Sequence, residues 1–230
     1  MRLDQFVSKA TGLSRKQSHK VIRAGHVSVE GAVHKKAAEH IDPDARVQLN
    51  HETIALPGMI YLMMNKPPGF ICATEDAQQP TVIDLIDHAH WYTLHPVGRL
   101  DRDTTGLLLI SNDGQWTHHI TAPRHQLDKV YLAQLAEPLA ERAAKQLREG
   151  VTLEGEKQPV RAVDLVILPQ QQARITIREG KYHQIKRMFA AVGNHVEALQ
   201  RECIGGLSLD PELDLGEWRP LTADESALLD

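Results

Sequence analysis

The chain has 230 residues, of which 42% are hydrophobic and 24% charged, and its formal net charge is -4 at pH 7. This composition argues against a disordered chain and suits one large domain, or a large domain with a small companion. No apolar run reaches the roughly 18 residues that span a bilayer, and the first residues lack the apolar core of a secretory signal. The two cysteines, Cys72 and Cys203, have no CxxC spacing. We therefore expect a cytoplasmic protein without a thiolate metal site.

The net charge conceals an uneven distribution along the chain. Residues 209–230 hold seven acids and one base, whereas residues 1–28 hold six bases and a single acid, Asp4. Binding of a polyanion depends on the local charge and not on the sum over the chain. The N-terminal segment is therefore the candidate for contact with a polyanion.

Two short helices are predicted at the N-terminus. The apolar spacing over residues 3–10 is typical of one helical face, and Gly12 can end that helix. Ser14 and Gln17 fit a capping box that begins a second helix, and Gly25 stands where its C-terminal cap belongs. Short strands follow in HVSVEG and ARVQL.

The second helix gathers potential cations on one side, because its basic residues recur at helical spacing. In an arbitrary protein such a face is most often a solvated surface. The pattern LSRKQSHKVIRAGHVSVEG, however, also resembles the small RNA-binding module first described in ribosomal protein S4, over about the first fifty residues. The resemblance implies RNA contacts from Arg15, Lys16, Lys20 and Arg23.

A second domain is expected after a linker at residues 51–58, HETIALPG, where a Pro-Gly pair ends a weakly patterned stretch. The predicted domains are thus 1–58 and 59–230. We expect strands at 60–65, 107–110, 129–135, 160–168, 173–179, 196–201 and 217–221, helices at 81–87, 140–149 and 183–192, and a turn at 112–114. Since strands outnumber helices, the fold class is α+β: a small N-terminal module, then a larger domain with a mostly antiparallel mixed sheet.

The stretch GRLDRDTTGLLLI at residues 98–110 places Asp101 between Arg99 and Arg102, directly before an apolar strand. Flanking guanidinium groups favour the ionised carboxylate, so we expect both arginines to keep Asp101 anionic. An ionised carboxylate at that position suits a nucleophile, a base or a structural ion pair. From these residue types alone, the structural ion pair is the more common case.

Three further segments, NKPPG at 65–69, KVY at 129–131 and EGKYHQIKRM at 179–188, accompany this stretch in order. Together they resemble the pseudouridine synthase family typified by the bacterial small-subunit ribosomal RNA enzyme, from about Ile60 to about Leu221. Relatives that act on large-subunit RNA tend to have Asn-Arg-Gln where this chain has Tyr-His-Gln, residues 182–184. The resemblance implies isomerisation of one uridine in 16S (small-subunit) ribosomal RNA to pseudouridine.

The family's site residues carry over to matching positions of this chain. The resemblance implies that Asp101 is the catalytic residue, that Lys186 pairs with it, that Tyr131 stacks on the target base, and that Arg99 holds the extruded nucleotide or occupies its place. Asp101 could add to the uracil ring, attack C1′ or take the C2′ proton, and residue types leave these three roles open. No cofactor is implied, and the implied partner is 16S ribosomal RNA in a partly assembled small subunit.

Other functions are less consistent with the sequence. A glycosidase using Asp101 and Asp103 would lack a proton donor, because flanking arginines favour two ionised carboxylates. The adjacent pair His118 and His119 points about 100° apart on a helix, which argues against zinc, and no GxSxG motif appears. A large-subunit RNA substrate and a non-catalytic RNA-binding assembly factor remain as alternatives. With no coiled-coil seam or obvious apolar patch, a monomer is expected.

Overall fold

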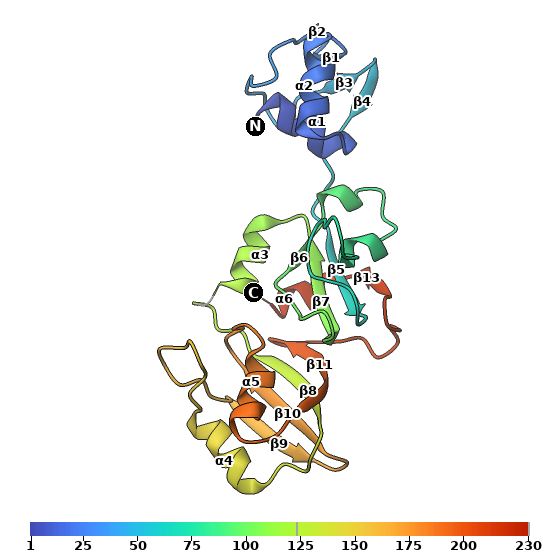
Figure 1. The fold of residues 1–230 in the computed structure, drawn as a ribbon. Helices are drawn as coiled ribbons and strands as arrows, with labels where there is room; N and C mark the ends of the chain where they lie inside the picture. Colours follow the sequence, from blue (N-terminus) through green and yellow to red (C-terminus); the bar gives the residue numbers. More distant parts are fainter. Residues whose placement is uncertain (123, 230) are drawn as a thin grey trace. The chain divides into compact units, whose positions relative to one another are not determined.

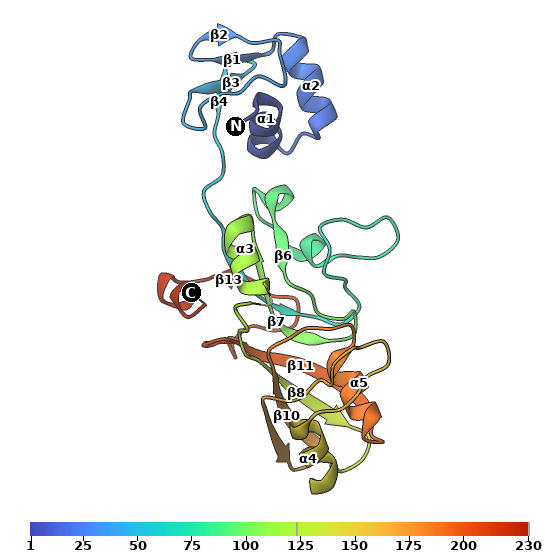
Figure 2. The ribbon, with the colours of Figure 1, turned by 90° about the vertical axis from the view of Figure 1, so that its left-hand side faces the viewer.

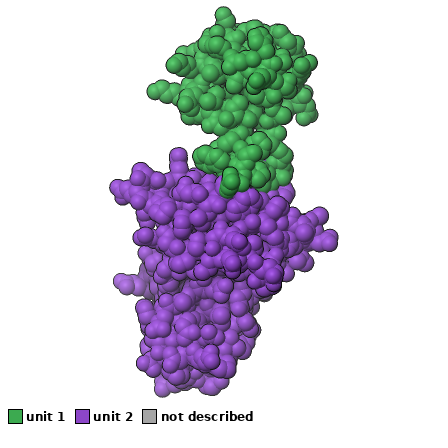
Figure 3. Space-filling model, turned by 90° about the vertical axis from the view of Figure 1, so that its right-hand side faces the viewer, with its two compact units in different colours: residues 1–60, 87–94 green, residues 61–86, 95–230 purple. Residues whose placement is uncertain are grey.

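The computed structural model describes residues 1–122 and 124–229. The chain divides into two compact units, drawn in different colours in Figure 3. Unit 1 consists of residues 1–60 and 87–94, and unit 2 consists of residues 61–86 and 95–230. Residues 87–94, which the sequence placed in the second domain, are therefore part of the N-terminal unit.

Unit 1 packs two helices, α1 (Leu3–Thr11) and α2 (Arg15–Arg23), against a small antiparallel sheet (Figure 2). The strand order is β2 (Ala32–Val33), β1 (Val27–Val29), β3 (Val47–Leu49) and β4 (Glu52–Ile54). The apolar stripe of α1 is buried in the core beside Ile22 and Val27. Gly12 ends α1 in the left-handed region at φ 76°, and the capping box of Ser14 and Gln17 is formed, so both predicted helix boundaries are confirmed.

The expected linker at 51–58 is wrong at its beginning, because β4 occupies part of it. Leu49 pairs with Glu52, which leaves Asn50 and His51 as a two-residue hairpin loop. Both loop residues have positive φ, at 50° and 71°, as a type I′ turn requires. Asn50 is a residue that tolerates this conformation, and it is the local signal that could have revealed the hairpin.

Unit 2 is built on one large sheet (Figure 1). Its main path runs in the order β13, β5, β7, β11, β8, β10, β9, with β6 paired to β7 and β12 paired to β11. Among the described strands of this sheet, every pairing is antiparallel except that of β7 with β11. The strands are β5 (Tyr61–Lys66), β6 (His95–Val97), β7 (Thr105–Ser111), β8 (Lys129–Leu135), β9 (Asp164–Leu168), β10 (Gln172–Ile177), β11 (Val196–Ile204), β12 (Leu207–Ser208) and β13 (Trp218–Pro220). The predicted α+β class with a mostly antiparallel sheet is confirmed.

The helices of unit 2 flank this sheet. Helix α3 contacts β6, α4 contacts β9, and α5 contacts β11. Figures 1 and 2 show α4 and α5 beside the half of the sheet formed by β8 to β11. Their bounds are α3 (Gly114–Thr121), α4 (Glu141–Glu149), α5 (Gln184–Ala191) and α6 (Ala223–Ala227); short 3-10 helices span η1 (Val82–Leu85) in unit 2 and η2 (Trp91–Thr93) in unit 1.

Three local expectations differ from the structure. The predicted turn at 112–114 is the start of α3, where the Asp113 carboxylate accepts hydrogen bonds from the backbone N–H groups of residues 115 and 116. The short helix expected at 81–87 is present as the 3-10 helix η1, but it covers only Val82–Leu85. Strand β9 begins at Asp164 and not at residue 160, because Val160 instead bridges to Val151 behind α4.

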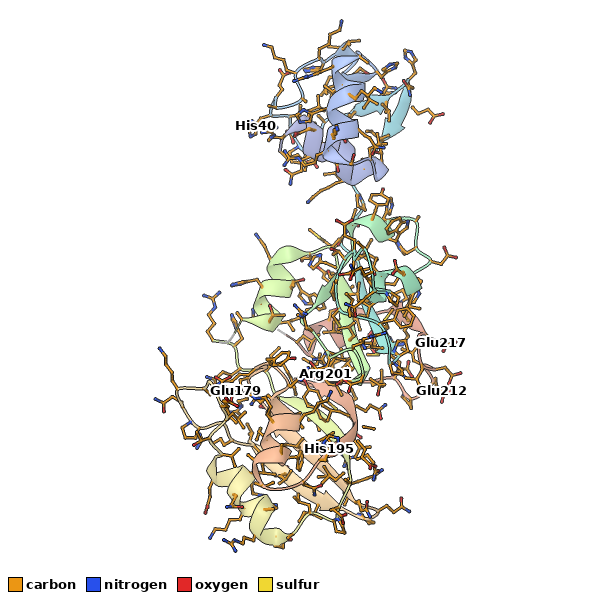
Figure 4. The ribbon with its side chains drawn as sticks, in the orientation of Figure 1. His40, Glu179, His195, Arg201, Glu212 and Glu217 are labelled. Carbon is orange, nitrogen blue, oxygen red and sulfur yellow. The ribbon has the colours of Figure 1, made fainter. Side chains whose placement is uncertain are left out.

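Strand β7 lies inside the large sheet, between β5 and β11, and its apolar run, residues 107–110, is fully buried. Such a run is typical of a strand covered on both faces. Next to it, Gly106 has a φ of 97°, and a Cβ there would clash with the backbone of Arg201 in β11. Figure 4 labels Arg201, whose guanidinium Nε donates to the carbonyl of Leu107 at 2.7 Å. The close passage of β7 and β11 therefore depends on a residue without a side chain.

Candidate functional site

A cleft of about 440 Å³ opens in unit 2 beside the loop that joins β6 to β7. Its walls come from that loop, from the segment that leads into α5 and the first turn of α5, from Ile71 and Cys72 after β5, and from single residues of β8, β10 and β11. The four residues expected from the sequence, Asp101, Arg99, Tyr131 and Lys186, all line it. Residues from six separate parts of the chain thus meet around one space large enough for a nucleotide.

Asp101 lies in the loop before β7, with its carboxyl group 29% exposed. The loop turns there because the backbone N–H of Thr104 donates to the carbonyl of Asp101 at 3.1 Å. Two cationic or titratable groups from the α5 region face the carboxylate. Lys186 Nζ lies 3.5 Å from Asp101 Oδ2, and His183 Nε2 lies 3.7 Å from Oδ1. The carboxylate is therefore accessible to a ligand and held between two nitrogen groups.

The expected pairing of Asp101 with its neighbouring arginines is wrong. Among the residues that the structure describes, Asp101 forms no ion pair with Arg99 or Arg102. Arg102 instead donates from Nε to the carbonyl of Gly69 at 3.0 Å, and Arg99 is exposed at the cleft. Neighbours in an extended loop point in different directions, so adjacency in sequence does not bring their side chains together. Helix α5 supplies the cation in their place.

Lys186 is shared between two carboxylates. Its ammonium group lies 2.5 Å from Asp103 Oδ1, closer than to Asp101. This hydrogen bond lowers the pKa of Asp103 below its ordinary value, and partial burial opposes the shift. Asp103 is 73% exposed, whereas Lys186 is 23% exposed, so the pair lies at the edge of the cleft.

Tyr131 lies inside the cleft, with 7% of its surface exposed. It stands in the middle of β8, where it pairs with Ile175 of β10 and Arg201 of β11. The alternation of β8 places Tyr131 on the same face as Ala133 and Leu135, which are fully buried. Tyr131 is therefore held by neighbouring strands on both sides, and its side chain forms part of the cleft wall.

Lys66, at the end of β5, anchors the loop that carries Asp101. Its side chain is fully buried, and Nζ donates to the carbonyls of Pro67, Arg102 and Thr104 at 3.0, 3.2 and 3.0 Å. Burial lowers the pKa of this lysine, although nearby acidic groups oppose the shift. In the sequence, NKPPG served only as one segment of the family resemblance, and no role was assigned to this lysine. A lysine that ends an apolar strand directly before two prolines was the available signal.

Unit 1 carries a second hollow of about 730 Å³, which is lined by basic side chains. It contains the four predicted RNA-binding residues together with two more, and its lining is Arg2, Arg15, Lys16, His19, Lys20 and Arg23. The expected residues are thus brought together on the surface formed by α2 and the start of α1.

Asp4 organises this basic hollow, a role that the sequence did not reveal. Its carboxylate is fully buried and accepts from Arg2 at 2.8 and 3.0 Å, from Arg15 at 2.9 Å, and lies 2.7 Å from His19 Nε2. The hydrogen bonds from Arg2 lower the pKa of Asp4 far below its ordinary value, against the effect of burial. Lys16, Lys20 and Arg23 remain exposed, and they extend the cationic surface beyond the ion pairs.

In the part of the chain that the structure describes, no group of three or more His, Cys, Asp or Glu side chains could hold a metal ion. None of the described helices combines the length and the apolar character that crossing a bilayer requires.

Comparison with known proteins gives matches over the whole chain. The sequence model of the family described as RNA pseudouridylate synthase matches residues 60–191, and that of the S4 domain matches residues 1–47. The ribosomal small subunit pseudouridine synthase A of Escherichia coli (strain K12) is 46% identical over 228 residues, covering 99% of each chain. The protein of the same name from Vibrio cholerae serotype O1 is 43% identical over 227 residues, covering 99% of this chain and 98% of its own.

A solved structure agrees with these matches. It is described as a crystal structure of pseudouridylate synthase, is 42% identical, covers 100% of both chains and has a TM-score of 0.73. Asp101, Tyr131 and Lys186 lie within the first matched region, and the basic residues of α2 lie within the second.

Proposed function

Because the chain belongs to the RNA pseudouridylate synthase family, and is thus an isomerase, we propose that it converts one uridine of 16S (small-subunit) ribosomal RNA to pseudouridine with a single essential aspartate, Asp101. The observation that carries the proposal is the partly exposed Asp101 carboxylate in a nucleotide-sized cleft, with Tyr131 inside it and Lys186 at its edge. The substrate follows from the full-length similarity to proteins named for the small subunit.

The chemistry requires little beyond these groups. The N1–C1′ bond breaks, the uracil turns, C5 bonds to the same sugar carbon, and the proton that leaves C5 is balanced by one gained at N1. Because the product is an isomer of the substrate, the atoms balance without a co-reactant, and we propose that no cofactor takes part. Asp101 would act as nucleophile or base on the flipped nucleotide, with Lys186 orienting the carboxylate.

The RNA is held by more than the cleft. Tyr131 offers a face on which an extruded base can stack, and Arg99, exposed at the cleft, can contact a phosphate or fill the position that the base has left. The basic hollow of unit 1, with Arg15, Lys16, Lys20 and Arg23, binds phosphates elsewhere on the RNA. We further propose a monomer that acts in the cytoplasm on a partly assembled small subunit.

Replacement of the carboxylate tests this function. Asp101→Asn should abolish the release of tritium from RNA labelled at uridine C5, while RNA affinity stays within about twofold, because the shape of the cleft is kept. Asp103→Asn serves as the matched control: if only Asp101 reacts, this variant forms pseudouridine at a reduced but measurable rate. Full turnover by Asp101→Asn would refute the proposal.

Two alternatives are separated by the products. A glycosidase that pairs Asp101 with Asp103 would release free uracil and leave an abasic sugar. A non-catalytic assembly factor would bind RNA through unit 1 and leave every uridine unchanged. Mapping of pseudouridine in ribosomal RNA from cells with and without the gene tests the substrate: the missing modification should lie in 16S RNA, and a change in the large subunit would contradict that assignment.

A further inference from the structure

An exposed aromatic side chain, Tyr182, lies on the cleft that contains Asp101. It belongs to the segment between β10 and α5, and 75% of its surface is open to solvent. An aromatic ring exposed to this degree at the edge of a binding cleft indicates contact with a ligand, because the rest of the cleft provides the polar groups that orient one.

The Tyr182 ring is fixed in orientation although it is exposed. It stacks on the His183 ring, with centroids 3.9 Å apart and an interplanar angle of 16°. One face of the tyrosine is covered by this contact, and the high exposure leaves the other face open. Since His183 Nε2 lies 3.7 Å from Asp101 Oδ1, the open face has a defined position relative to the reactive carboxylate.

The backbone around the two rings is also held. His183 has a φ of 47°, in the left-handed region that a residue with a side chain occupies only when its surroundings impose it. Arg187 donates to the carbonyl of Tyr182 at 3.1 Å and also reaches the carbonyl of Glu154. The rings are thus part of a preorganised loop, which reduces the entropic cost of binding a ligand.

The two tyrosines of the cleft differ in depth. Tyr131 is 7% exposed and Tyr182 is 75% exposed, yet both line the same space. A uracil that reaches Asp101 beside Tyr131 leaves its neighbour in the strand at the mouth of the cleft. Once the target uracil is extruded, the adjacent nucleobase no longer stacks on it. An aromatic ring can replace this stacking for any of the four bases, because each base has an aromatic face.

We propose that Tyr182 is the stacking platform for the nucleobase next to the target uridine, so that the enzyme binds RNA that is unpaired on at least one side of its target. This inference rests on the proposed function and adds a binding residue and a substrate class to it. His183 is a positioning residue that sets the plane of the platform.

The test uses the full-length protein and a fragment of 16S RNA centred on the mapped uridine. Two RNAs carry the fluorescent base 2-aminopurine, one on the 5′ side of the target and one on the 3′ side. Tyr182→Ala should raise KM about tenfold or more while kcat stays within about twofold, because stacking of this kind supplies binding. Tyr182→Phe, which keeps the ring, should restore the wild-type affinity.

The fluorescence of 2-aminopurine distinguishes stacking by Tyr182 from a purely structural role of this residue, because only stacking on the probe quenches it. The wild-type protein should quench 2-aminopurine in one of the two RNAs, and Tyr182→Ala should lose that quenching while its thermal unfolding is unchanged. Trp91→Ala removes another exposed aromatic side chain, 53% exposed in unit 1, and should change neither quantity.

The outcomes separate this inference from the proposed function. Equal KM values and equal fluorescence for the wild type and Tyr182→Ala overturn the platform, as does a decrease confined to kcat. Quenching that depends on Tyr182, in a protein that forms no pseudouridine, retains the platform and overturns the proposed reaction.

Discussion

Lys66 shows how a residue that is remote from the chemistry can fix the position of Asp101. Its buried ammonium group holds the carbonyls on both sides of Asp103, and it connects β5 to the loop that carries Asp101. Removal of a buried donor that serves several carbonyls is costly. Each carbonyl loses its hydrogen-bond donor, and water cannot readily reach the buried site to replace it.

We predict that Lys66→Met lowers the free energy of unfolding by about 2–4 kcal/mol and reduces kcat more than it changes KM. Urea unfolding and steady-state kinetics measure the two effects. Lys145→Met is the control, since Lys145 is 73% exposed and pairs with a surface glutamate, and it should change stability by less than about 0.5 kcal/mol. Unchanged stability and kinetics for Lys66→Met would show that the anchor is dispensable.

Among single residues, the sequence predicted which side chains line the cleft better than it predicted their contacts. Motif order and the family resemblance placed Asp101, Tyr131 and Lys186 together, and the structure brings all three to one cleft. The predicted pairing of Lys186 with Asp101 is present, whereas within the described residues Arg99 and Arg102 form no ion pair with Asp101, because side-chain direction in a loop depends on the elements packed around it. His183 had no distinguishing signal, since its approach to Asp101 follows from a left-handed backbone that the sequence does not mark.

Among the elements, α6 depends on a small ion-pair cluster. Arg219 of β13 donates to both carboxylate oxygens of Glu225 in α6 and to Asp210 in the preceding loop. The hydrogen bonds from Arg219 lower the pKa of Glu225 from 4.5 to about 2. A carboxyl group whose pKa is lower in the folded state contributes stability that is present above its ordinary pKa and is lost as the pH falls through the lowered value.

We therefore predict that Glu225→Gln lowers the free energy of unfolding of unit 2 by about 1–2 kcal/mol at pH 7. The difference from wild type should shrink below pH 4.5 and vanish near pH 2, as protonation removes the same interaction. Urea unfolding, followed by the fluorescence of Trp116 and Trp218, measures it across this range. Asp224→Asn, on the exposed side of the same helix, should show no comparable pH dependence, and a pH-independent effect of Glu225→Gln would contradict the ion-pair explanation.

The close approach of β7 to β11 leads to a second prediction about the strands and helices, which concerns Gly106. Gly106→Ala combines a positive φ with a clash against the backbone of β11, so we expect destabilisation by more than about 4 kcal/mol, or no soluble protein. Gly114→Ala, at the start of α3, meets no atom within 4 Å and should be neutral or slightly stabilising. Soluble yield and thermal unfolding compare the two variants, and similar stabilities would show that the strands can separate at little cost.

Local patterns explain which elements could be predicted. Helices α1, α2, α4 and α5 and most strands of unit 2 have apolar spacing or turn residues that define them without tertiary contacts. Helix α3 was missed because its polar, histidine-rich sequence lacks a clear apolar stripe, although Asp113 is a good N-cap. Strand β4 is short and largely exposed, so its pairing with β3 and not its own pattern determines its structure.

For the whole molecule, the uneven charge distribution predicts how RNA binding responds to salt. Lys16 and Lys20 are exposed at the basic hollow and are not part of the Asp4 cluster, so they are available to phosphates. Lys16→Ala combined with Lys20→Ala should weaken RNA binding and flatten the slope of log K against log salt by about 0.7–0.9 for each phosphate that the variant no longer neutralises. Filter binding between low and moderate salt measures the slope.

The matched control for this prediction lies in unit 2. Lys145→Ala combined with Lys157→Ala removes the same charge from exposed positions outside the hollow and should leave the slope nearly unchanged. Equal slopes for the two double variants would show that only the total charge matters and that α2 does not contact phosphate.

The order of the strands in the large sheet could not be predicted from the sequence. Hydrophobic patterning identifies a strand, but its partners are set by contacts between residues far apart in the chain, and several pairings bury the same residues. The insertion of β11 between β7 and β8 is such a case. Gly106, which permits the close approach of β7 to β11, was the one local feature of the sequence related to it. The α+β class could be predicted because it depends on the number and type of elements and not on their neighbours.

That insertion has a consequence for biosynthesis. As the chain emerges from the ribosome, β7 and β8 appear first, with the edges that will receive β11 still unpaired, and β11 closes the gap only near the end of translation. Asp101 is made early, whereas Lys186 and the remaining wall of the cleft arrive just ahead of β11. The cleft around Asp101 therefore cannot be complete until the chain through β11 has left the ribosome, and until then the edges of β7 and β8 that pair with β11 stay open.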